Sequence, residues 1–344
     1  MDLSPSSLRM CPATDCWFLT GPTAAGKTAV GVALAERIGA EIVSMDSMAL
    51  YRGMDIGTAK PAPADRQAVP HHLIDVLEPH QEYSLAQYLD AAHGQIAEIR
   101  GRGRESLFVG GTPLYLKGLL RGIFQGPPAD WQLRRELQDF ARQHGSAALH
   151  RRLAEVDPAA AKRLHPNDTR RLVRALEVFE KTGRPISELQ RQFDVGRPAE
   201  ACRVFVLDWP REELHARIDR RVDAMFAAGL VDEVRGLLYS ERGTGTSPRP
   251  VSPIEVLTGS EPVPLSEQPL SRTASQAVGY REVIEHLQGQ HTLPDAVELV
   301  KRHTRQLAKR QMTWFRSLSE CRFVPMEGED GAGAVVEKIL SGRP

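Results

Sequence analysis

The sequence predicts an α/β protein, in which a parallel sheet is flanked by helices and an all-helical domain is inserted. Three observations predict this fold class. Short apolar runs alternate with helical patterns over residues 16–126, as in strand–helix–strand units. Gly126-Pro127-Pro128 then opens an arginine-rich stretch, residues 130–195, that is almost entirely helical in pattern. Val204–Leu207 follows as one more apolar strand, which returns to the sheet.

These breaks set the expected domain limits. We expect a core made of residues 15–126 and 200–344, with a helical insertion domain at residues 127–199. Residues 241–272 repeat Pro, Ser, Gly and Thr and contain few aromatic side chains. Because such a stretch has little apolar surface to bury, we expect a disordered loop inside the core.

Each element is placed by its own pattern. Strands are expected where short apolar runs are bounded by turn residues, at Trp17–Thr20, Glu41–Met45, Leu73–Val76, Ser106–Val109, Val204–Leu207 and Arg322–Pro325. Helices are expected at Ala29–Ile38, Ser84–Arg100, Glu212–Ala228, Val231–Tyr239, Pro294–Arg316 and Ala332–Leu340, with helical pattern also from Ala274. Ser84 suits a helix N-cap, and Gly39 suits the C-cap of the first helix.

The composition excludes several classes of protein. The 344 residues are 41% hydrophobic and 26% charged, and their net charge is zero, so no overall field draws the chain to nucleic acid or membrane. Its four cysteines form no Cys-x-x-Cys pair, which argues against a zinc ribbon or a disulfide framework. Neither a signal peptide nor a membrane span is visible. We therefore expect a cytoplasmic protein, by default a monomer.

The most informative motif is Gly21-Pro22-Thr23-Ala24-Ala25-Gly26-Lys27-Thr28, which stands between an apolar strand and a helix. This is the P-loop pattern in its required context, and it predicts a P-loop NTPase-like core. The glycines let successive backbone N–H groups point at one anionic centre, to which the helix adds its positive end. Lys27 suits an outer phosphate, and the Thr28 hydroxyl suits Mg²⁺. The motif predicts a diphosphate or polyphosphate ligand without deciding between them.

Polar groups follow other strands at the edge where a P-loop sits. Asp46-Ser47 comes directly after the second strand, and its carboxylate suits a general base, a helix cap or a Mg²⁺ ligand. Gly110-Gly111-Thr112 ends another strand, where a motor ATPase would carry an aspartate. Asp75 is an alternative aspartate of that kind. Gly53–Pro61 contains two glycines, a threonine and a proline, which predict a shaped loop.

Basic residues gather on three predicted helices. Arg217 and Arg221 share a helix face because they are four apart, and they suit either a leaving diphosphate or a solvated basic face. Residues 301–316 hold six Lys or Arg, no acidic residue and an aromatic pair. Residues 170–174 form a second cluster. In a chain of zero net charge, such local concentrations indicate contacts with a nucleic-acid backbone.

Taken together, these motifs resemble those of the tRNA dimethylallyltransferases, or tRNA isopentenyltransferases, of bacterial type. The resemblance runs in order from about residue 16 to residue 326, through Gly21–Thr28, Asp46-Ser47, Tyr51–Lys60, Val109–Thr112, His165–Asp168, Val278–Arg281 and Arg305–Arg310. It implies transfer of a dimethylallyl group from dimethylallyl diphosphate to N6 of the adenosine 3′ of the anticodon. The tRNAs would be those that read UNN codons, and Mg²⁺ would be the cofactor.

The resemblance also implies roles for individual residues. Asp46 would be the general base, Thr112 would line the reaction channel, and Arg217 or Arg221 would assist the departing diphosphate. The diphosphate site would comprise Gly21, Pro22, Thr23, Ala24, Ala25, Gly26, Lys27 and Thr28, with Thr28 also on the metal. The tRNA contacts would comprise Asp46, Ser47, Met48, Ala49, Thr112, Arg134, Arg170, Arg171, Leu172, Val173, Arg174, Gln276, Ala277, Val278, Gly279, Tyr280, Arg281, Thr304, Arg305, Gln306, Leu307, Ala308, Lys309, Arg310 and Gln311.

One stretch departs from the family pattern, and two other interpretations stay open. The segment between Tyr239 and Ser275 is longer than in the family members that the chain resembles most. A small-molecule kinase would also combine a P-loop, a carboxylate after the second strand and an arginine-bearing lid. A non-catalytic RNA-binding protein would keep the P-loop as a relic, although the intact Gly26-Lys27-Thr28 speaks against that.

Overall fold

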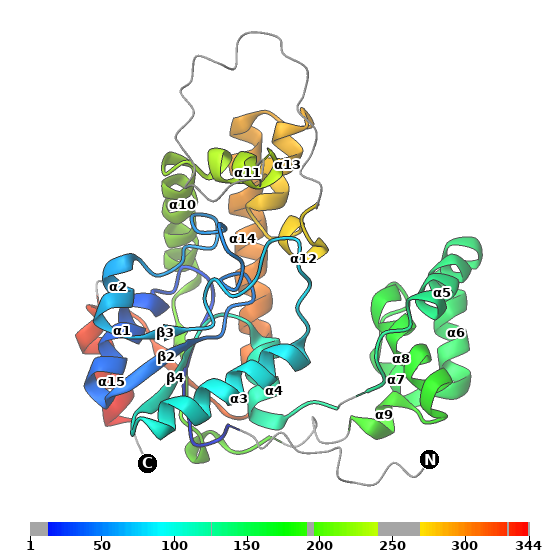
Figure 1. The fold of residues 1–344 in the computed structure, drawn as a ribbon, viewed down its shortest axis with the longest axis horizontal. Coiled ribbons are helices and arrows are strands. Elements are labelled where there is room, and N and C mark those ends of the chain that lie inside the picture. Colours follow the sequence, from blue (N-terminus) through cyan, green and yellow to red (C-terminus); the bar gives the residue numbers. More distant parts are fainter. Residues whose placement is uncertain (1–12, 125, 191–195, 240–268, 329, 343–344) are drawn as a thin grey trace. The chain divides into compact units, whose positions relative to one another are not determined.

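The computed structural model describes residues 13–124, 126–190, 196–239, 269–328 and 330–342 of the chain (Figure 1). Most of the loop expected at 241–272 therefore lies outside the described residues. The chain divides into two compact units. A helical unit comprises Ala13 and the described part of Lys117–Gly196, and a sheet unit comprises the described part of Thr14–Leu116 and Arg197–Pro344.

The sheet unit is built on six parallel strands. Their order is β3-β2-β4-β1-β5-β6, with β1 at Trp17–Thr20, β2 at Ala40–Ser44, β3 at His71–His72, β4 at Glu105–Val109, β5 at Val204–Asp208 and β6 at Cys321–Pro325. The strand before the P-loop, β1, is one of the two central strands and pairs with β4 and β5. The α/β fold expected from the sequence is confirmed. Because all strands run parallel, their carboxyl ends meet at one edge, where ligands bind in such sheets.

Helices cover both faces of this sheet (Figure 1). The sheet unit contains α1 at Lys27–Ile38, α2 at Pro63–Ala68, α3 at Leu85–Gly101, α10 at Arg211–Ala227, α11 at Leu230–Tyr239, α12 at Arg272–Ser275, α13 at Tyr280–Leu287, α14 at Leu293–Arg316 and α15 at Ala332–Ser341, with a 3₁₀ turn at Ala199–Ala201. The expected caps are present: the Ser84 hydroxyl accepts the Gln87 N–H before α3, and Gly39 ends α1 with left-handed backbone.

The described part of the helical unit contains five helices and part of a sixth. They are α5 at Trp131–His144, α6 at Ser146–Val156, α7 at Pro158–Arg163, α8 at Thr169–Thr182 and α9 at Ile186–Leu189. The helix α4, at Pro113–Arg121, begins in the sheet unit and ends in the helical unit. Leu137, Leu149, Leu153, Leu172 and Leu176 form a core of their own, so the unit buries apolar surface independently of the sheet.

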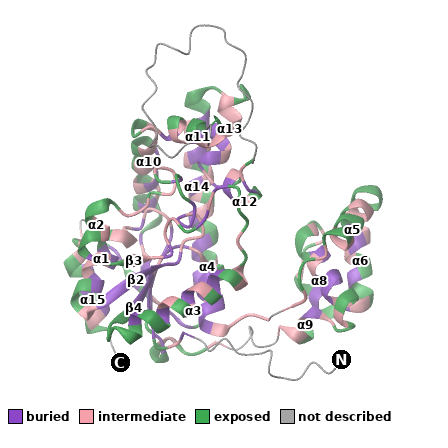
Figure 2. Cartoon of the chain, viewed as in Figure 1, coloured by how far each residue is buried: buried purple, intermediate pink, exposed green. Residues whose placement is uncertain are grey.

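The apolar core of the sheet unit anchors the strand before the P-loop and the helix after it. The residues of β1 and β2 are buried along the whole of each strand, and Figure 2 shows β2 in the colour of buried residues. Leu19 and Trp17 of β1 pack with Leu34 of α1 and Phe205 of β5 in one apolar cluster. At about 25 cal/mol per Å² of buried apolar surface, such side chains dominate the stability of the fold. The loop between β1 and α1 is therefore anchored at both ends by buried residues.

One predicted strand is wrong. Leu73–Val76 is not a strand: β3 covers only His71–His72, and the backbone then turns at Leu73 and Asp75, both with φ of 57°. The Asp75 N–H donates to the Ala49 carbonyl, and the Val76 N–H donates to that of Leu50. The Asp75 carboxylate is bound by Lys60 and Arg66. Tertiary contacts therefore override an apolar run that reads locally as a strand.

Candidate active site

The P-loop curls because its backbone leaves the regions that most residues prefer. Gly21 and Gly26 have φ of 147° and 88°, and Ala24 has φ of 65°. A side chain at Gly21 would also approach the Leu207 carbonyl oxygen to 3.0 Å. Glycine is required at such positions because it has no Cβ. The turn delivers Lys27 as the first residue of α1, where backbone N–H groups are unpaired and the helix end is positive.

Lys27 is a half-buried cation of the P-loop. Its Nζ donates to the carbonyl oxygens of Gly21 at 3.1 Å and Pro22 at 2.7 Å. Burial and then the nearby charge of Arg221 lower the pKa of Lys27 to about 8, while the charge of Asp46 opposes the change. The protein itself therefore supplies too little negative charge to balance the cations in this pocket. An anionic ligand would relieve that imbalance.

One pocket of about 690 Å³ opens at the carboxyl edge of the sheet. It brings together Lys27 and Thr28 of the P-loop, Asp46 and Thr112 from two strand ends, and Arg221 from α10. Its other lining residues include several from the segments expected to contact tRNA, namely Ser47, Met48, Ala49, Gln276, Ala277, Val278, Gly279, Tyr280, Thr304, Leu307, Arg310 and Gln311. The pocket thus joins phosphate-binding groups, a carboxylate and residues of the segments expected to contact tRNA.

The structure separates the two arginines of α10. Arg221 lines the main pocket with Lys27, and its Nη2 donates to the Thr58 carbonyl at 3.4 Å. Arg217 instead supports the P-loop: its Nε donates to the Ala24 carbonyl at 2.9 Å, and its guanidinium stacks 4.2 Å from the Trp209 ring centroid. Burial lowers the pKa of both guanidinium groups. Arg221 thus lies in the main pocket with Lys27, whereas Arg217 and Arg221 together line a smaller pocket beside Ala24 and Gly26 of the P-loop.

Asp46 and Thr112 are held by the strand ends that precede them. The Asp46 Oδ1 accepts the Met48 N–H at 2.9 Å, and the Thr112 Oγ1 accepts the Ser47 N–H at 3.0 Å. A Cβ at Gly110 would lie 2.2 Å from the Met45 carbonyl carbon. The glycine therefore permits β4 to bring Thr112 alongside Asp46. This close approach gives a physical reason for glycines where a motor ATPase carries an aspartate.

Gln311 is a bridge that the sequence did not reveal. Its Oε1 accepts the Thr23 N–H at 2.9 Å, and its Nε2 donates to the Gly111 carbonyl at 2.6 Å. The side chain is buried. We expected Gln311 as a tRNA contact, but its amide is engaged with the P-loop and with the turn after β4. The pairing spans 288 residues of sequence, so no local pattern could have indicated it.

Other P-loop and helix residues have mainly internal contacts. Ala25 is buried, and its carbonyl accepts the Trp209 Nε1–H at 3.0 Å. On α14, Arg305 pairs with Asp219, and Ala308 is buried. Lys309 and Arg310 are exposed on the same helix. Among the expected tRNA contacts of α14, these two cations are therefore the most accessible to a polyanion.

In the helical unit, two residues that we expected to contact tRNA, Arg134 and Arg174, both donate hydrogen bonds to one buried carboxylate. Glu177 has no exposed surface, and it accepts hydrogen bonds from Arg134 at two atoms and from Arg174. Arg170 and Arg171 are exposed at the start of α8, whereas Leu172 and Val173 are buried in the core of the unit. Any RNA contact through the side chains of residues 170–174 would therefore be made by the arginines.

The described residues supply few metal ligands of their own. They contain no group of three or more His, Cys, Asp or Glu arranged to hold a metal ion. Thr28 nevertheless offers its hydroxyl in the pocket that also contains Asp46. A Mg²⁺ ion commonly binds through one or two protein ligands, several waters and substrate phosphates, so the residues present fit a metal that arrives with a diphosphate. Within the described ranges, no helix is both long and apolar enough to cross a membrane.

A P-loop after a central strand, with a carboxylate and an arginine around one pocket, defines a P-loop NTPase-like protein with a site for a phosphate-bearing substrate. Comparison with known proteins narrows this class. A family model described as IPP transferase matches residues 49–318, and one described as isopentenyl transferase matches residues 14–75.

Relatives cover nearly the whole chain. A tRNA dimethylallyltransferase of Rhodopirellula baltica is 45% identical over 95% of this chain and 95% of its own length. One of Geobacter metallireducens is 46% identical over 91% of this chain and 93% of its own. The solved structure of a Bacillus halodurans tRNA isopentenylpyrophosphate transferase is 36% identical, with a TM-score of 0.63 and 95% of each chain covered. The chain belongs to the tRNA dimethylallyltransferase family.

Proposed function

We propose that the protein transfers the dimethylallyl group of dimethylallyl diphosphate to N6 of an adenosine in tRNA. The target is the adenosine 3′ of the anticodon in tRNAs that read UNN codons. The observation that carries the proposal is the single pocket in which Lys27, Arg221, Asp46 and Thr112 converge. The membership of the chain in the tRNA dimethylallyltransferase family supports the same reaction.

The reaction needs a good leaving group because an exocyclic amine is a weak nucleophile. N6 of adenosine forms a bond to C1 of the prenyl group, while the bond between C1 and the diphosphate oxygen breaks. The departing charge would meet Lys27, Arg221 and the backbone N–H groups of the P-loop. Thr28 would hold Mg²⁺, which neutralises phosphate charge when bound. This donor set suits a diphosphate that accumulates charge as it leaves.

Asp46 would take the proton that N6 loses when the new bond forms. Its Oδ1 already accepts the Met48 N–H, which orients the carboxylate. Thr112 would position the adenine beside it. A base inside a stacked loop is out of reach of a pocket, so we infer that the adenosine is flipped out. Lys309, Arg310 and the arginines of α8 would contact the phosphate backbone of the tRNA.

The proposal includes the setting of the enzyme. The four cysteines form no Cys-x-x-Cys pair, and the described ones, Cys16, Cys202 and Cys321, are buried, which suits a reducing cytoplasm. We propose a monomer that acts on tRNA there, with residues 127–199 as an insertion domain that contacts RNA.

One assay tests the function directly. The full chain is incubated with Mg²⁺, dimethylallyl diphosphate labelled in the prenyl group, and tRNA with adenosine 3′ of the anticodon. We expect label in the tRNA and release of diphosphate, and no transfer to a tRNA that carries guanosine at that position. Absence of label from tRNA, together with phosphoryl transfer from ATP to a small molecule, would establish the kinase alternative instead.

A further inference from the structure

A loop at residues 53–61 forms part of the wall of the main pocket. It contains neither helix nor strand. Gly57, Thr58, Ala59, Lys60 and Pro61 all line the pocket. A loop of this kind samples several conformations unless its backbone groups are bound elsewhere. Its hydrogen bonds therefore decide whether the wall is preformed.

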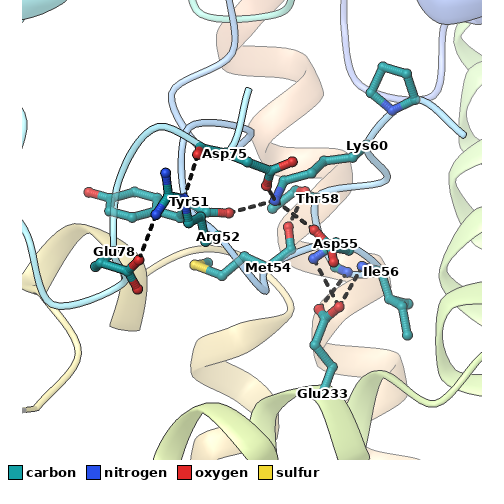
Figure 3. Close-up of polar contacts among 12 residues, drawn as sticks. Tyr51, Arg52, Met54, Asp55, Ile56, Thr58, Lys60, Asp75, Glu78 and Glu233 are labelled. Carbon is teal, nitrogen blue, oxygen red and sulfur yellow. Dashed lines mark hydrogen bonds and ion pairs between the residues drawn. The ribbon is translucent and has the colours of Figure 1, made fainter. Parts of the chain in front are cut away.

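One carboxylate, that of Glu233, holds residues 55–57 of this loop (Figure 3). The Glu233 Oε2 accepts the N–H groups of Asp55 at 2.9 Å and Ile56 at 2.7 Å. Its Oε1 accepts the Gly57 N–H at 3.1 Å and the Tyr280 hydroxyl at 2.6 Å. Four donors on one ionised acceptor make charge-assisted hydrogen bonds, which are about twice as strong as neutral ones.

The Tyr280 ring leaves no room for a side chain at Gly57. A Cβ at Gly57 would lie 2.5 Å from Cε2 of the Tyr280 ring, a separation that real Cβ atoms do not show. The ring is fully buried. The phenol therefore fixes the loop sterically as well as through Glu233, and Gly57 is required by this contact.

Lys60 and Thr58 hold the loop from within. The Lys60 side chain is 2% exposed and pairs with Asp55 and Asp75, and its Nζ also donates to the Tyr51 carbonyl. The Thr58 hydroxyl donates to the Met54 carbonyl at 2.6 Å. The loop is thus fixed by side chains that lie outside the set expected to touch a diphosphate.

We propose that Glu233, together with Tyr280, is a positioning group that holds the 53–61 loop as a preformed wall of the donor pocket. This inference rests on the proposed function, because it assigns the pocket to dimethylallyl diphosphate. If the wall is formed for only a fraction of the time, the apparent affinity for the donor falls by that fraction. Loss of the Glu233 contacts should therefore raise the donor KM, while kcat with the wall assembled changes little.

The test compares Glu233→Gln with Glu212→Gln, a matched control at an exposed glutamate on α10. A glutamine side chain lacks the charge and has only one acceptor oxygen. We expect the donor KM of Glu233→Gln to rise about tenfold, the order for losing hydrogen bonds to a charged group. The kcat and the Kd for tRNA should stay near those of the control. Amide hydrogen exchange at residues 55–57 should accelerate, which a remote structural change would not produce selectively.

Several results would overturn the inference. Unchanged donor KM with residues 55–57 still protected would remove Glu233 from this role. A raised Kd for tRNA with unchanged donor KM would assign Glu233 to RNA binding instead. Tyr280→Phe removes one hydrogen bond and keeps the ring, so a smaller rise in donor KM is expected even if Glu233→Gln does not fold. If the parent chain transfers no prenyl group, the proposed function fails, and amide exchange alone still judges the loop contact.

Discussion

The Asp46 carboxylate has room for two roles at once. One oxygen accepts the Met48 N–H in a turn that begins no helix, and the side chain still lines the pocket beside Lys27 and Thr112. A hydrogen bond that fixes the carboxylate is also what a general base needs in order to face its proton. Of the three roles weighed from the sequence, the helix cap is therefore not found, and the turn bond is compatible with the role of general base.

This gives the first prediction. Asp46→Asn keeps an oxygen for the Met48 N–H but removes the base, so we expect kcat for prenyl transfer to fall by about 10²- to 10⁴-fold. Single-turnover assays and tRNA titration check it. Asp46→Ala should behave alike, with little change in tRNA affinity. A loss of tRNA binding large enough to explain the lost activity would make Asp46 an RNA contact instead.

The second prediction concerns Gly110. A Cβ there would overlap the Met45 carbonyl, so β4 and the end of β2 would have to move apart. We expect Gly110→Ala to destabilise the fold by roughly 3 kcal/mol or more. Gly94→Ala on the exposed side of α3 is the control, since a Cβ there meets nothing within 4 Å. That variant should gain about 0.5–1 kcal/mol. Urea unfolding measures the free energy of unfolding of both variants. Equal free energies of unfolding for Gly110→Ala and Gly94→Ala would refute the steric argument.

At the scale of elements, Glu41 ties the edge of the sheet to α3. This residue of β2 is buried, and its carboxylate binds Arg102 after α3 and His72 of β3. The hydrogen bond from Arg102, followed by that from His72, lowers the pKa of Glu41 to about 2 despite burial. A carboxylate whose pKa is lower in the folded chain stabilises it above the ordinary pKa, and that stability is lost as the pH falls toward the folded pKa.

The third prediction follows from the lowered pKa of Glu41. Glu41→Gln should lower the free energy of unfolding by roughly 1–3 kcal/mol near neutral pH. The difference from the parent should shrink between about pH 4.5 and pH 2, where the parent carboxyl also becomes neutral. Urea unfolding at several pH values checks it, with Glu36→Gln, at an exposed residue of α1, as control. A difference that does not depend on pH would show that packing, and not charge, stabilises this corner.

The same scale shows what sequence patterns can and cannot predict. The strand before the P-loop and the helix after it follow from an apolar run, a glycine turn and a glycine C-cap, all local signals. The strand predicted at Leu73–Val76 is wrong because the turn found there depends on Lys60 and Arg66, which bind the Asp75 carboxylate. The role of Glu233 could not be predicted for a related reason: its partners on the loop are 176 to 178 residues away in the sequence.

At the scale of the whole molecule, the zero net charge means that the protein as a whole does not attract RNA. With 44 basic and 44 acidic residues, long-range attraction to RNA must come from local groups. Many arginines in the expected RNA segments are already paired within the protein, among them Arg305 with Asp219 and Arg134 with Glu177. We therefore expect the exposed cations to carry most of the salt-dependent affinity for RNA.

The fourth prediction tests this with Lys309 and Arg310. Replacing both by alanine should weaken tRNA binding and reduce the slope of log K against log salt by about 1–2, since each phosphate contact contributes roughly 0.7–0.9. Lys309→Ala alone should leave the donor KM unchanged, because only Arg310 lines the pocket. Arg37→Ala, an exposed site at the far end of α1, controls for charge. An unchanged slope would exclude these two residues from the RNA interface.

Gln311 carries a consequence for changing the specificity of the protein. It lies one residue beyond Arg310 on α14, yet its amide braces the P-loop at Thr23 and the turn at Gly111. Any redesign that rotates or shifts α14 to suit another RNA would also disturb the phosphate cradle. Directed evolution toward new RNA targets should therefore accumulate substitutions outside the C-terminal turns of α14, while Gln311 stays fixed.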